Sequence, residues 1–350
     1  MNQTRVQEIA MRVVGDQAGA FTMALGYIGD RLGIFAALRD AGPVTSEALA
    51  AIAGLNERYV REWLRAMVAS EYVEYDPETE TYRMDPEQAH VLAFEDSPMF
   101  VGGAFHITLP SLLNVPRVMD AFRRGGGVPY DELGADVPCA MERFFRPGYK
   151  HHLNTEWLPA VPGLVQRLTR GIDVLDVGCG RGQSTVHMAE AWPASRFTGL
   201  DYHGESIAGA MKNAADRGLS NVSFLQEAAH RISRDRQYDL ICSFDCIHDM
   251  VDPLETLKTI RSVLKEDGVY IWAEPNLSHL AHENRNPIGR AFHAVSPLHC
   301  LTVSLAYDGA GLGTVIGEKG ARDLASQAGF VSFERLPIPN PFNQFFALRR

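Results

Sequence analysis

The hydrophobic pattern divides the chain into a helical first part and an alternating second part. Along residues 1–40, apolar residues such as Ile9, Val13 and Phe21 recur at spacings of three and four, which predicts helices. Beyond residue 170, short apolar runs alternate with helical segments. We expect strands near 172–177, 196–201, 222–226, 238–244, 268–274, 331–336 and 342–348. This alternation predicts an α/β fold with a parallel sheet.

Residues 43–84 carry the pattern of a winged helix-turn-helix. Thr45 or Ser46 is placed to cap a short helix, and Asn56 is placed to cap a second helix over residues 57–69. Alternating segments at 72–75 and 81–84 then predict a hairpin. The hairpin is acidic and would repel phosphates, so dimerisation is favoured over DNA binding. Its acidic residues are Glu71, Glu74, Asp76, Glu78 and Glu80.

These patterns predict two domains. Residues 1–165 form a mainly α, winged-helix dimerisation domain with linker helices. Residues 166–350 form the α/β domain, in which a helical cap is inserted at about 276–317.

A glycine-rich loop follows the first strand of the α/β domain. Asp173 to Ser184 reads Asp-Val-Leu-Asp-Val-Gly-Cys-Gly-Arg-Gly-Gln-Ser, and a helix is expected from Gln183. Such a loop lets a ligand lie against bare backbone, so we expect a nucleoside-containing cofactor. A P-loop is excluded because no Gly-Lys-Ser/Thr follows, and the last glycine of the dinucleotide fingerprint is replaced by Gln183. Asp201 suits ribose hydroxyls, which NAD and S-adenosylmethionine both present.

An ordered set of motifs narrows the choice. Asp176–Gly182 is followed by Gly199-Leu200-Asp201, Phe224-Leu225-Gln226-Glu227-Ala228-Ala229, Tyr238-Asp239-Leu240-Ile241-Cys242-Ser243-Phe244 and Leu264-Lys265-Glu266-Asp267-Gly268. This set resembles the class I S-adenosylmethionine-dependent methyltransferases over roughly residues 165–350. With the winged-helix part, the chain resembles plant-type and bacterial small-molecule O-methyltransferases, which usually dimerise through that part.

The resemblance implies a Rossmann-like sheet, S-adenosyl-L-methionine as cofactor and a role for each matching residue. The glycines would line the methionine and ribose portions, Asp176 would help hold the amino group, and Asp201 would take the ribose hydroxyls. Tyr202, Glu227 and Ala228 would lie at the adenine, and Phe244 would lie under the cofactor. The implied cofactor residues are thus Asp176, Gly178, Gly180, Gly182, Asp201, Tyr202, Glu227, Ala228 and Phe244.

A His-Asp pair, His248 and Asp249, matches the catalytic position of the plant-type enzymes. A hydroxyl acceptor must lose its proton, so the resemblance implies His248 as general base, with Asp249 beside it. Met250 stands where the family usually has Trp, and Glu274 and Glu283 are the candidates for a second carboxylate. A thioether acceptor such as 4-methylthio-2-hydroxybutyrate, on the route to dimethylsulfoniopropionate, would need no base. From another class, the chain could be a DNA-binding regulator that senses S-adenosylmethionine.

Aromatic residues and histidines before the glycine loop and in the cap are the candidates for acceptor binding. They are Phe145, Tyr149, His152, Trp157, His293 and Tyr307. No bound metal is expected, because the histidines lack a His-x-x-x-His pair on a helix.

Composition limits the partners. The 350 residues carry a formal net charge of −10, which argues against broad nucleic-acid binding and against anionic membranes. Five scattered cysteines do not suggest a disulfide framework, and no apolar run has membrane-spanning length. We therefore expect a cytoplasmic homodimer that acts on a small molecule.

Overall fold

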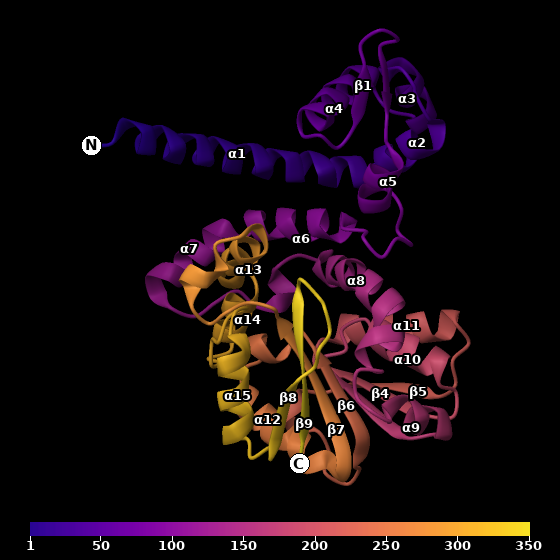
Figure 1. The fold of residues 1–350 in the computed structure, drawn as a ribbon, viewed down its shortest axis with the longest axis vertical. Coiled ribbons are helices and arrows are strands. Elements are labelled where there is room, and N and C mark those ends of the chain that lie inside the picture. Colours follow the sequence, from indigo (N-terminus) through magenta and orange to yellow (C-terminus); the bar gives the residue numbers. More distant parts are fainter. The chain divides into compact units, whose positions relative to one another are not determined.

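The computed structural model describes residues 1–350, and its backbone contacts divide the chain into two units, Met1–Leu109 and Pro110–Arg350 (Figure 1). Each unit has a hydrophobic core of its own. The sequence-based boundary at 165/166 grouped residues 110–165 with the first domain. In the structure these residues belong to the second unit, since their helices pack against the sheet domain.

The first unit is a winged helix-turn-helix preceded by a long helix. Its elements are α1 Gln3–Arg31, α2 Ile34–Ala41, α3 Ser46–Ala53, α4 Glu57–Ala69, β1 Glu74–Asp76, β2 Thr81–Arg83 and α5 Pro86–Leu92, and α6 Gly102–Leu113 runs across the boundary. The Thr45 hydroxyl accepts a hydrogen bond from the amide of Ala48, and the Asn56 side chain accepts one from the amide of Tyr59. Both predicted caps are therefore present.

Most of α1 has no partner within its unit. Its C-terminal end is fixed by the Trp63 indole, whose N–H donates to the Leu25 carbonyl at 2.8 Å. Toward the N-terminus the apolar residues are exposed, namely Val6, Ile9, Met11, Val13, Val14 and Phe21. By length and composition, no single helix qualifies as a membrane span; only α1 and α2 taken together, with a 70° bend between them, pass that test.

The second unit is built on a seven-stranded sheet in the order β5-β4-β3-β6-β7-β9-β8. The strands are β3 Asp173–Val177, β4 Arg196–Asp201, β5 Val222–Gln226, β6 Tyr238–Phe244, β7 Leu264–Pro275, β8 Ser332–Arg335 and β9 Asn343–Arg349. The first five are parallel, whereas β9 runs antiparallel to both its neighbours. Every predicted strand is present, which confirms the α/β prediction.

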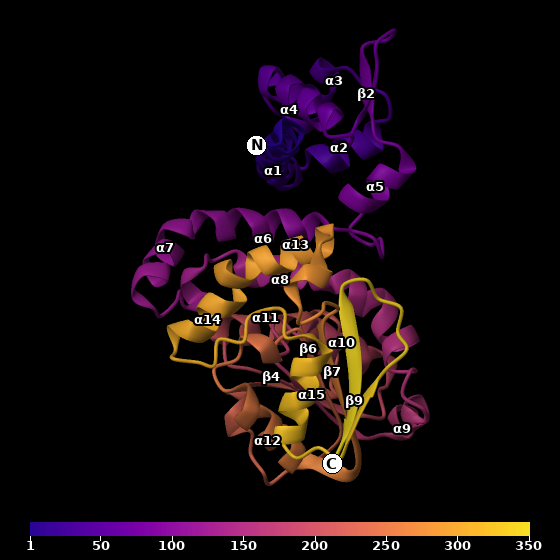
Figure 2. The same cartoon turned by 60° about the vertical axis from the view of Figure 1, so that its left-hand side comes forward.

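Helices cover both faces of the sheet (Figures 1 and 2). Leu168 of α9 (Leu164–Arg170) and Met188 of α10 (Gln183–Ala191) belong to the core on one face. Leu257 of α12 (Pro253–Val263) and Ala321 of α15 (Gly317–Gln327) belong to the core on the other. The remaining helices are α7 Val115–Arg124, η1 Tyr130–Glu132, α8 Val137–Gly148, η2 Tyr149–Trp157, α11 Gly204–Asp216, η3 Ala229–Arg231, η4 Ile247–Asp249, η5 Ala281–Asn284, α13 Pro287–Leu298 and α14 Cys300–Ala306.

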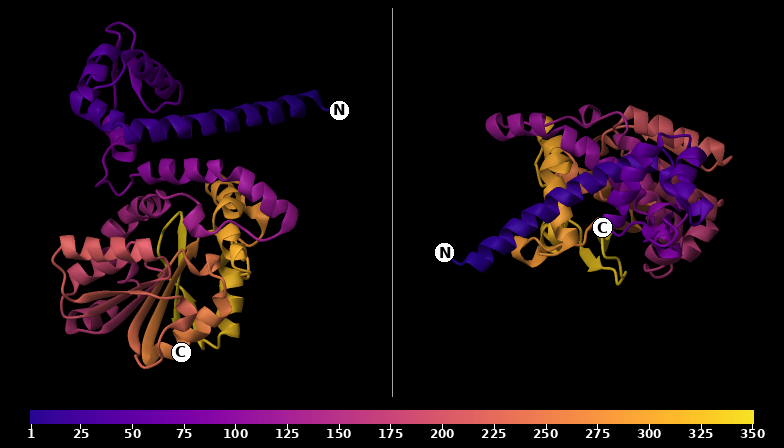
Figure 3. Two further views of the ribbon diagram at one scale, coloured as in Figure 1. Left: turned by 180° about the vertical axis from the view of Figure 1, so that it is seen from behind. Right: turned by 90° about the horizontal axis from the view of Figure 1, so that it is seen from above.

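Two of these segments bear on the site. The predicted cap contains η5, α13 and α14, and α13 lies beside α7 both from the front (Figure 1) and from behind (Figure 3). The segment η2 is a nine-residue π-helix that continues directly from α8. π-Helical turns are rare and occur often at functional sites, and no signal in the sequence predicted this one.

Strand order also fixes where a ligand can bind. From β3 the chain moves outward to β4 and β5 and then returns to β6 on the other side of β3. In open α/β sheets, ligands bind in the crevice at the carboxyl ends of the strands where the order reverses. Here that crevice lies beyond the ends of β3 and β6.

Candidate active site

The glycine loop opens this crevice. Gly178, Gly180 and Gly182 all have positive φ, of 70°, 53° and 76°, a region that side chains disfavour. A Cβ on Gly178 would meet the Cys246 Sγ at 2.6 Å, whereas one on Gly180 would have no neighbour within 4 Å. The loop therefore packs tightly against the strand ends at Gly178 and leaves free space over Gly180.

Asp201 at the end of β4 holds this loop from the opposite side. Its Oδ2 accepts a hydrogen bond from the Gly180 amide and its Oδ1 accepts one from the His203 amide, each at 2.9 Å. Carboxylate oxygens have further lone pairs, so the same group can also accept from ligand hydroxyls. This geometry suits the ribose-binding role that the resemblance implies.

Asp176 lies beneath the loop and does not reach the free space. It is buried, and its Oδ2 accepts from the Ser184 hydroxyl at 2.5 Å and the Thr185 hydroxyl at 2.6 Å. Burial raises its pKa to about 6, against the opposing effect of these two hydrogen bonds. In this structure Asp176 therefore fixes the start of α10 to the end of β3.

A cavity of about 590 Å³ occupies the crevice. Predicted residues that line it are Phe145, Tyr149, Gly178, Gly180, Asp201, Tyr202, Glu227, Ala228, Phe244, Asp249 and Tyr307. This volume is within the usual range for small-molecule sites. The cavity thus brings together most of the proposed cofactor residues, one residue of the His-Asp pair and three of the proposed acceptor residues.

Three predicted acceptor residues lie elsewhere. His152 is paired with Glu156, with its Nδ1 2.9 Å from Oε1, and His293 contacts the Asn284 amide nitrogen at 3.1 Å. Trp157 is buried behind the cavity wall, with its ring centroid 4.7 Å from that of Phe345. Trp157 also packs against Tyr149 and Phe244, which do line the cavity, so it supports the wall.

Glu142 on α8 is a site residue that the sequence did not reveal. Its carboxylate accepts hydrogen bonds from the Arg181 Nε, from the Gln183 Nε2 at 2.6 Å and from the Asn213 Nδ2 at 3.0 Å. Arg181 belongs to the glycine loop, Gln183 begins α10 and Asn213 lies on α11. One partly buried carboxylate thus ties α8, which also carries Phe145, to the glycine-loop side of the cavity.

The His248 imidazole is oriented by a buried carboxylate. Its Nδ1 lies 2.5 Å from the Glu274 Oε2, and the Trp272 indole donates to the other oxygen, Oε1, at 2.7 Å. Burial opposes protonation of the ring, but the Glu274 charge and the nearby Cys300 raise the pKa of His248 well above its ordinary value. Glu274, and not Glu283, is therefore the second carboxylate at this position.

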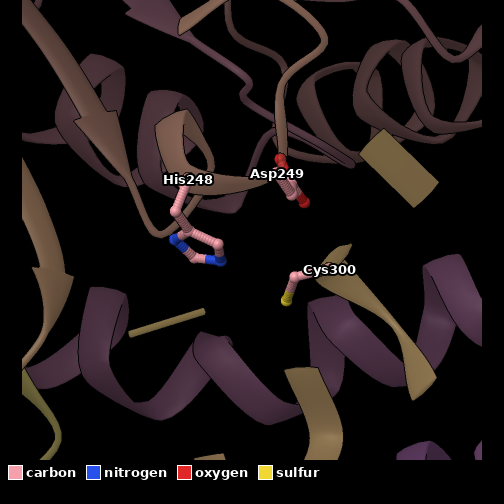
Figure 4. Close-up of side chains that lie close together, drawn as sticks. All are labelled: His248, Asp249 and Cys300. Atoms are coloured by element: carbon pink, nitrogen blue, oxygen red, sulfur yellow. The ribbon is translucent and has the colours of Figure 1, made fainter. Parts of the chain in front are cut away.

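Asp249 and Cys300 face the same space as the His248 ring (Figure 4). One ligating atom of each residue lies within 4.8 Å of the other two. Asp249 lines the cavity, but His248 and Cys300 are not among its lining residues, so the ring lies one layer behind the wall. Burial, together with the charge of Glu274, raises the pKa of Asp249 to about 7 although His248 opposes the rise.

The same three side chains offer one nitrogen, one oxygen and one sulfur atom, which could also coordinate a transition metal. The sequence did not reveal this group, because Cys300 is 51 residues from Asp249.

Asp245 is a second unpredicted carboxylate in the wall. It has a positive φ of 52°, and both of its oxygens accept from the Asn343 amide nitrogen, at 2.7 and 2.6 Å. Burial, with the charge of Glu274, raises its pKa to about 7. Because it directly follows β6, the rule that places ligands at strand ends could have identified it.

Comparison with known proteins agrees with this architecture. Residues 168–310 match the family model described as "Methyltransferase domain", and residues 19–94 match "Rv2258c-like winged HTH domain". The ubiquinone biosynthesis O-methyltransferase of Actinobacillus pleuropneumoniae serotype 5b is 30% identical over 112 residues, which cover 30% of this chain and 47% of that protein. The chain thus spans about half the length of the curated relatives that it matches.

Two solved structures are similar over nearly the whole chain. A putative O-methyltransferase from Nostoc punctiforme PCC 73102 has a TM-score of 0.76 at 20% identity, covering 98% of each chain. Human N-acetylserotonin methyltransferase, solved in complex with SAM, has a TM-score of 0.73 at 18% identity, covering 97% of each chain. At these identities the likeness establishes the fold. The chain therefore carries a winged helix-turn-helix domain match over residues 19–94, followed by a methyltransferase domain match over residues 168–310.

Proposed function

We propose that this protein transfers a methyl group from S-adenosyl-L-methionine to a hydroxyl oxygen of a small molecule. The observation that carries the proposal is the position of the His248–Glu274 pair directly behind a cavity that the glycine loop also lines. A glycine loop that binds a nucleoside occurs in enzymes of many activities, so the loop alone does not indicate the reaction. A buried, oriented imidazole beside that loop favours the removal of an acceptor proton.

The residues around the loop fit the cofactor. Space over Gly180 admits a ligand against bare backbone, and the Asp201 oxygens can accept from ribose hydroxyls. Glu227 and Ala228 line the same side, where an adenine would lie. When bound, S-adenosylmethionine supplies an electrophilic methyl group on a sulfonium sulfur. The chain then has to position the acceptor in line with that methyl group and remove the acceptor's proton.

His248 is oriented for the second task. Because Nδ1 is engaged by Glu274, a neutral ring carries its hydrogen on Nδ1, and its Nε2 lone pair, on the side of Cys300, is the site that can accept a proton. Asp249 lies between this ring and the cavity. A proton from the acceptor therefore reaches His248 past the Asp249 carboxyl, whose pKa of about 7 suits it to relay protons near neutral pH.

The same features disfavour a thioether acceptor. A neutral sulfur needs no base, so the buried His248–Glu274 pair would have no task in S-methylation. A hydroxy acid such as 4-methylthio-2-hydroxybutyrate would also need a cation for its carboxylate. Arg146, Arg285 and Arg290, the arginines considered for that task, do not line the cavity.

We also propose that two copies associate through the first unit and that this unit does not bind DNA. The exposed apolar residues of α1 support association, because isolated exposed helices of this length seldom remain without a partner. On α4, Arg58, Arg61 and Arg65 each pair with a glutamate of the same helix, at 2.6, 2.8 and 3.1 Å. These pairs and the acidic hairpin leave little positive charge for phosphates.

A screen of hydroxyl, amine and thioether compounds for release of S-adenosylhomocysteine tests the proposal. We expect release with a hydroxyl class and stoichiometric binding of S-adenosylhomocysteine by calorimetry. Release with thioethers alone would overturn the choice of oxygen. Absence of S-adenosylhomocysteine binding, or displacement of it by NAD, would overturn the cofactor.

A further inference from the structure

The cavity has an excess of negative groups next to His248. Asp245 and Asp249 line the cavity near His248, and Asp131 lines it beside His203, with its Oδ1 2.9 Å from the His203 Nε2. No lysine or arginine lines the cavity apart from Arg181 and Arg231. Arg181 is already paired with Glu142, and Arg231 lies on η3 at the adenine side. Of the histidines here, His299 stays neutral near pH 7, because burial and then the charge of His248 lower its pKa to about 4.

Aromatic rings accompany these carboxylates. Tyr130 on η1 and Tyr307 after α14 line the cavity near Asp131 and Asp249. Tyr130 packs edge-on against His299, with ring centroids 5.8 Å apart. The pKa of the Tyr130 hydroxyl is raised mainly by burial and further by the charges of Asp201 and Asp249. The pKa of Tyr307 is likewise raised mainly by burial and further by the charges of Asp131 and Glu132. Carboxylates thus lie close to both rings.

Carboxylates and tyrosine faces together favour one kind of group. An ammonium ion is attracted by both, whereas a carboxylate or phosphate here would face like charges. We propose that the acceptor carries an ammonium group besides its hydroxyl, held by Asp131 and by the faces of Tyr130 and Tyr307 in the field of Asp249. This inference rests on the proposed function and names the charge class of its acceptor.

Three catechols with short side chains of different charge test the proposal: dopamine, the neutral 3,4-dihydroxyphenylethanol and the anionic 3,4-dihydroxyphenylacetate. Their affinities are measured by calorimetry at pH 7.5 on protein saturated with S-adenosylhomocysteine, so the comparison does not depend on turnover. We expect dopamine to bind about tenfold more tightly than the anion, with the alcohol between them. Binding of the anion as tightly as dopamine, or no dopamine binding at millimolar concentration, would overturn the proposal.

A matched pair of variants locates the effect. Asp131→Asn removes one negative charge from the cavity, and Glu132→Gln removes one from the adjacent residue, which pairs with Arg117 and does not line the cavity. We expect D131N to weaken dopamine binding severalfold without changing the affinity of the alcohol, and E132Q to leave both nearly unchanged. Equal effects of the two variants would contradict a specific ammonium site. Failure of the proposed function would instead be seen as absence of S-adenosylhomocysteine release with every hydroxyl compound.

Discussion

The Nδ1 atom of His248 lies 2.5 Å from the Oε2 atom of Glu274, and both side chains are buried. This pair joins η4, after the fourth parallel strand of the sheet, to the end of β7. It fixes the tautomer of the imidazole and raises the pKa of His248. The consequences for catalysis can be measured separately from cofactor binding.

Glu274→Gln should change the pH dependence of turnover. A base must be unprotonated, so the rate of the natural protein should fall as pH decreases through the raised pKa of His248. Without the Glu274 charge that pKa decreases, so the fall should move to lower pH while the maximal rate also drops, because the ring is held less well. A profile of kcat against pH measures both effects, and unchanged affinity for S-adenosylhomocysteine serves as the folding control. An unmoved profile would contradict the pairing.

Asp249→Asn should slow methyl transfer without weakening cofactor binding. The amide keeps the shape of the side chain but cannot accept and pass on a proton, so kcat should fall about tenfold or more. The KM for S-adenosylmethionine should change little, since Asp249 lines the acceptor side next to His248. A rise of that KM with kcat retained would instead assign Asp249 to cofactor binding.

Glu142→Gln should weaken cofactor binding and leave kcat nearly unchanged, the reverse of the result expected for Asp249→Asn. The carboxylate accepts three hydrogen bonds from the loop and helices at the cofactor side, one of them from an arginine. Loss of the charge should raise the KM for S-adenosylmethionine about tenfold, since a hydrogen bond to a charged group contributes about 1.5–3 kcal/mol. Glu156→Gln, which alters an exposed pair with His152 on the next helix, is the matched control. Equal KM values for both variants would contradict the role of Glu142.

Chelation should leave turnover unchanged. His248 acts in proton transfer and needs no metal for it, so EDTA treatment of the purified protein should affect neither kcat nor S-adenosylhomocysteine binding. Turnover that EDTA removes and Zn²⁺ restores would show that the atoms of His248, Asp249 and Cys300 coordinate a metal.

The sequence was sufficient for the regular elements and for much of the lining of the cavity. Local periodicity and caps predicted the strands and the α3–α4 pair, because these signals depend on neighbouring residues. Motifs at strand ends likewise identified Gly180, Asp201 and Phe244, since the carboxyl ends of parallel strands meet at one edge.

The rest of the site depends on contacts between distant segments. Glu142 reaches Asn213 across 71 residues, and Asn343 reaches Asp245 across 98. His152 and His293 were predicted at the acceptor from residue type alone, and the structure pairs them with Glu156 and Asn284 instead. Helical segments such as η1 and η2 carry no periodic signal that would orient Tyr130 or Tyr149.

Methyl transfer by a His248→Ala variant tests the central claim most directly. With a hydroxyl acceptor found in the screen, single-turnover formation of methylated product should slow by about 10²–10⁴-fold, the usual contribution of a general base. Affinity for S-adenosylhomocysteine should be retained, and His152→Ala, whose side chain pairs with Glu156 and does not line the cavity, should behave like the natural protein. A His248→Ala protein that binds S-adenosylhomocysteine normally and methylates the acceptor at nearly the natural rate would contradict the account.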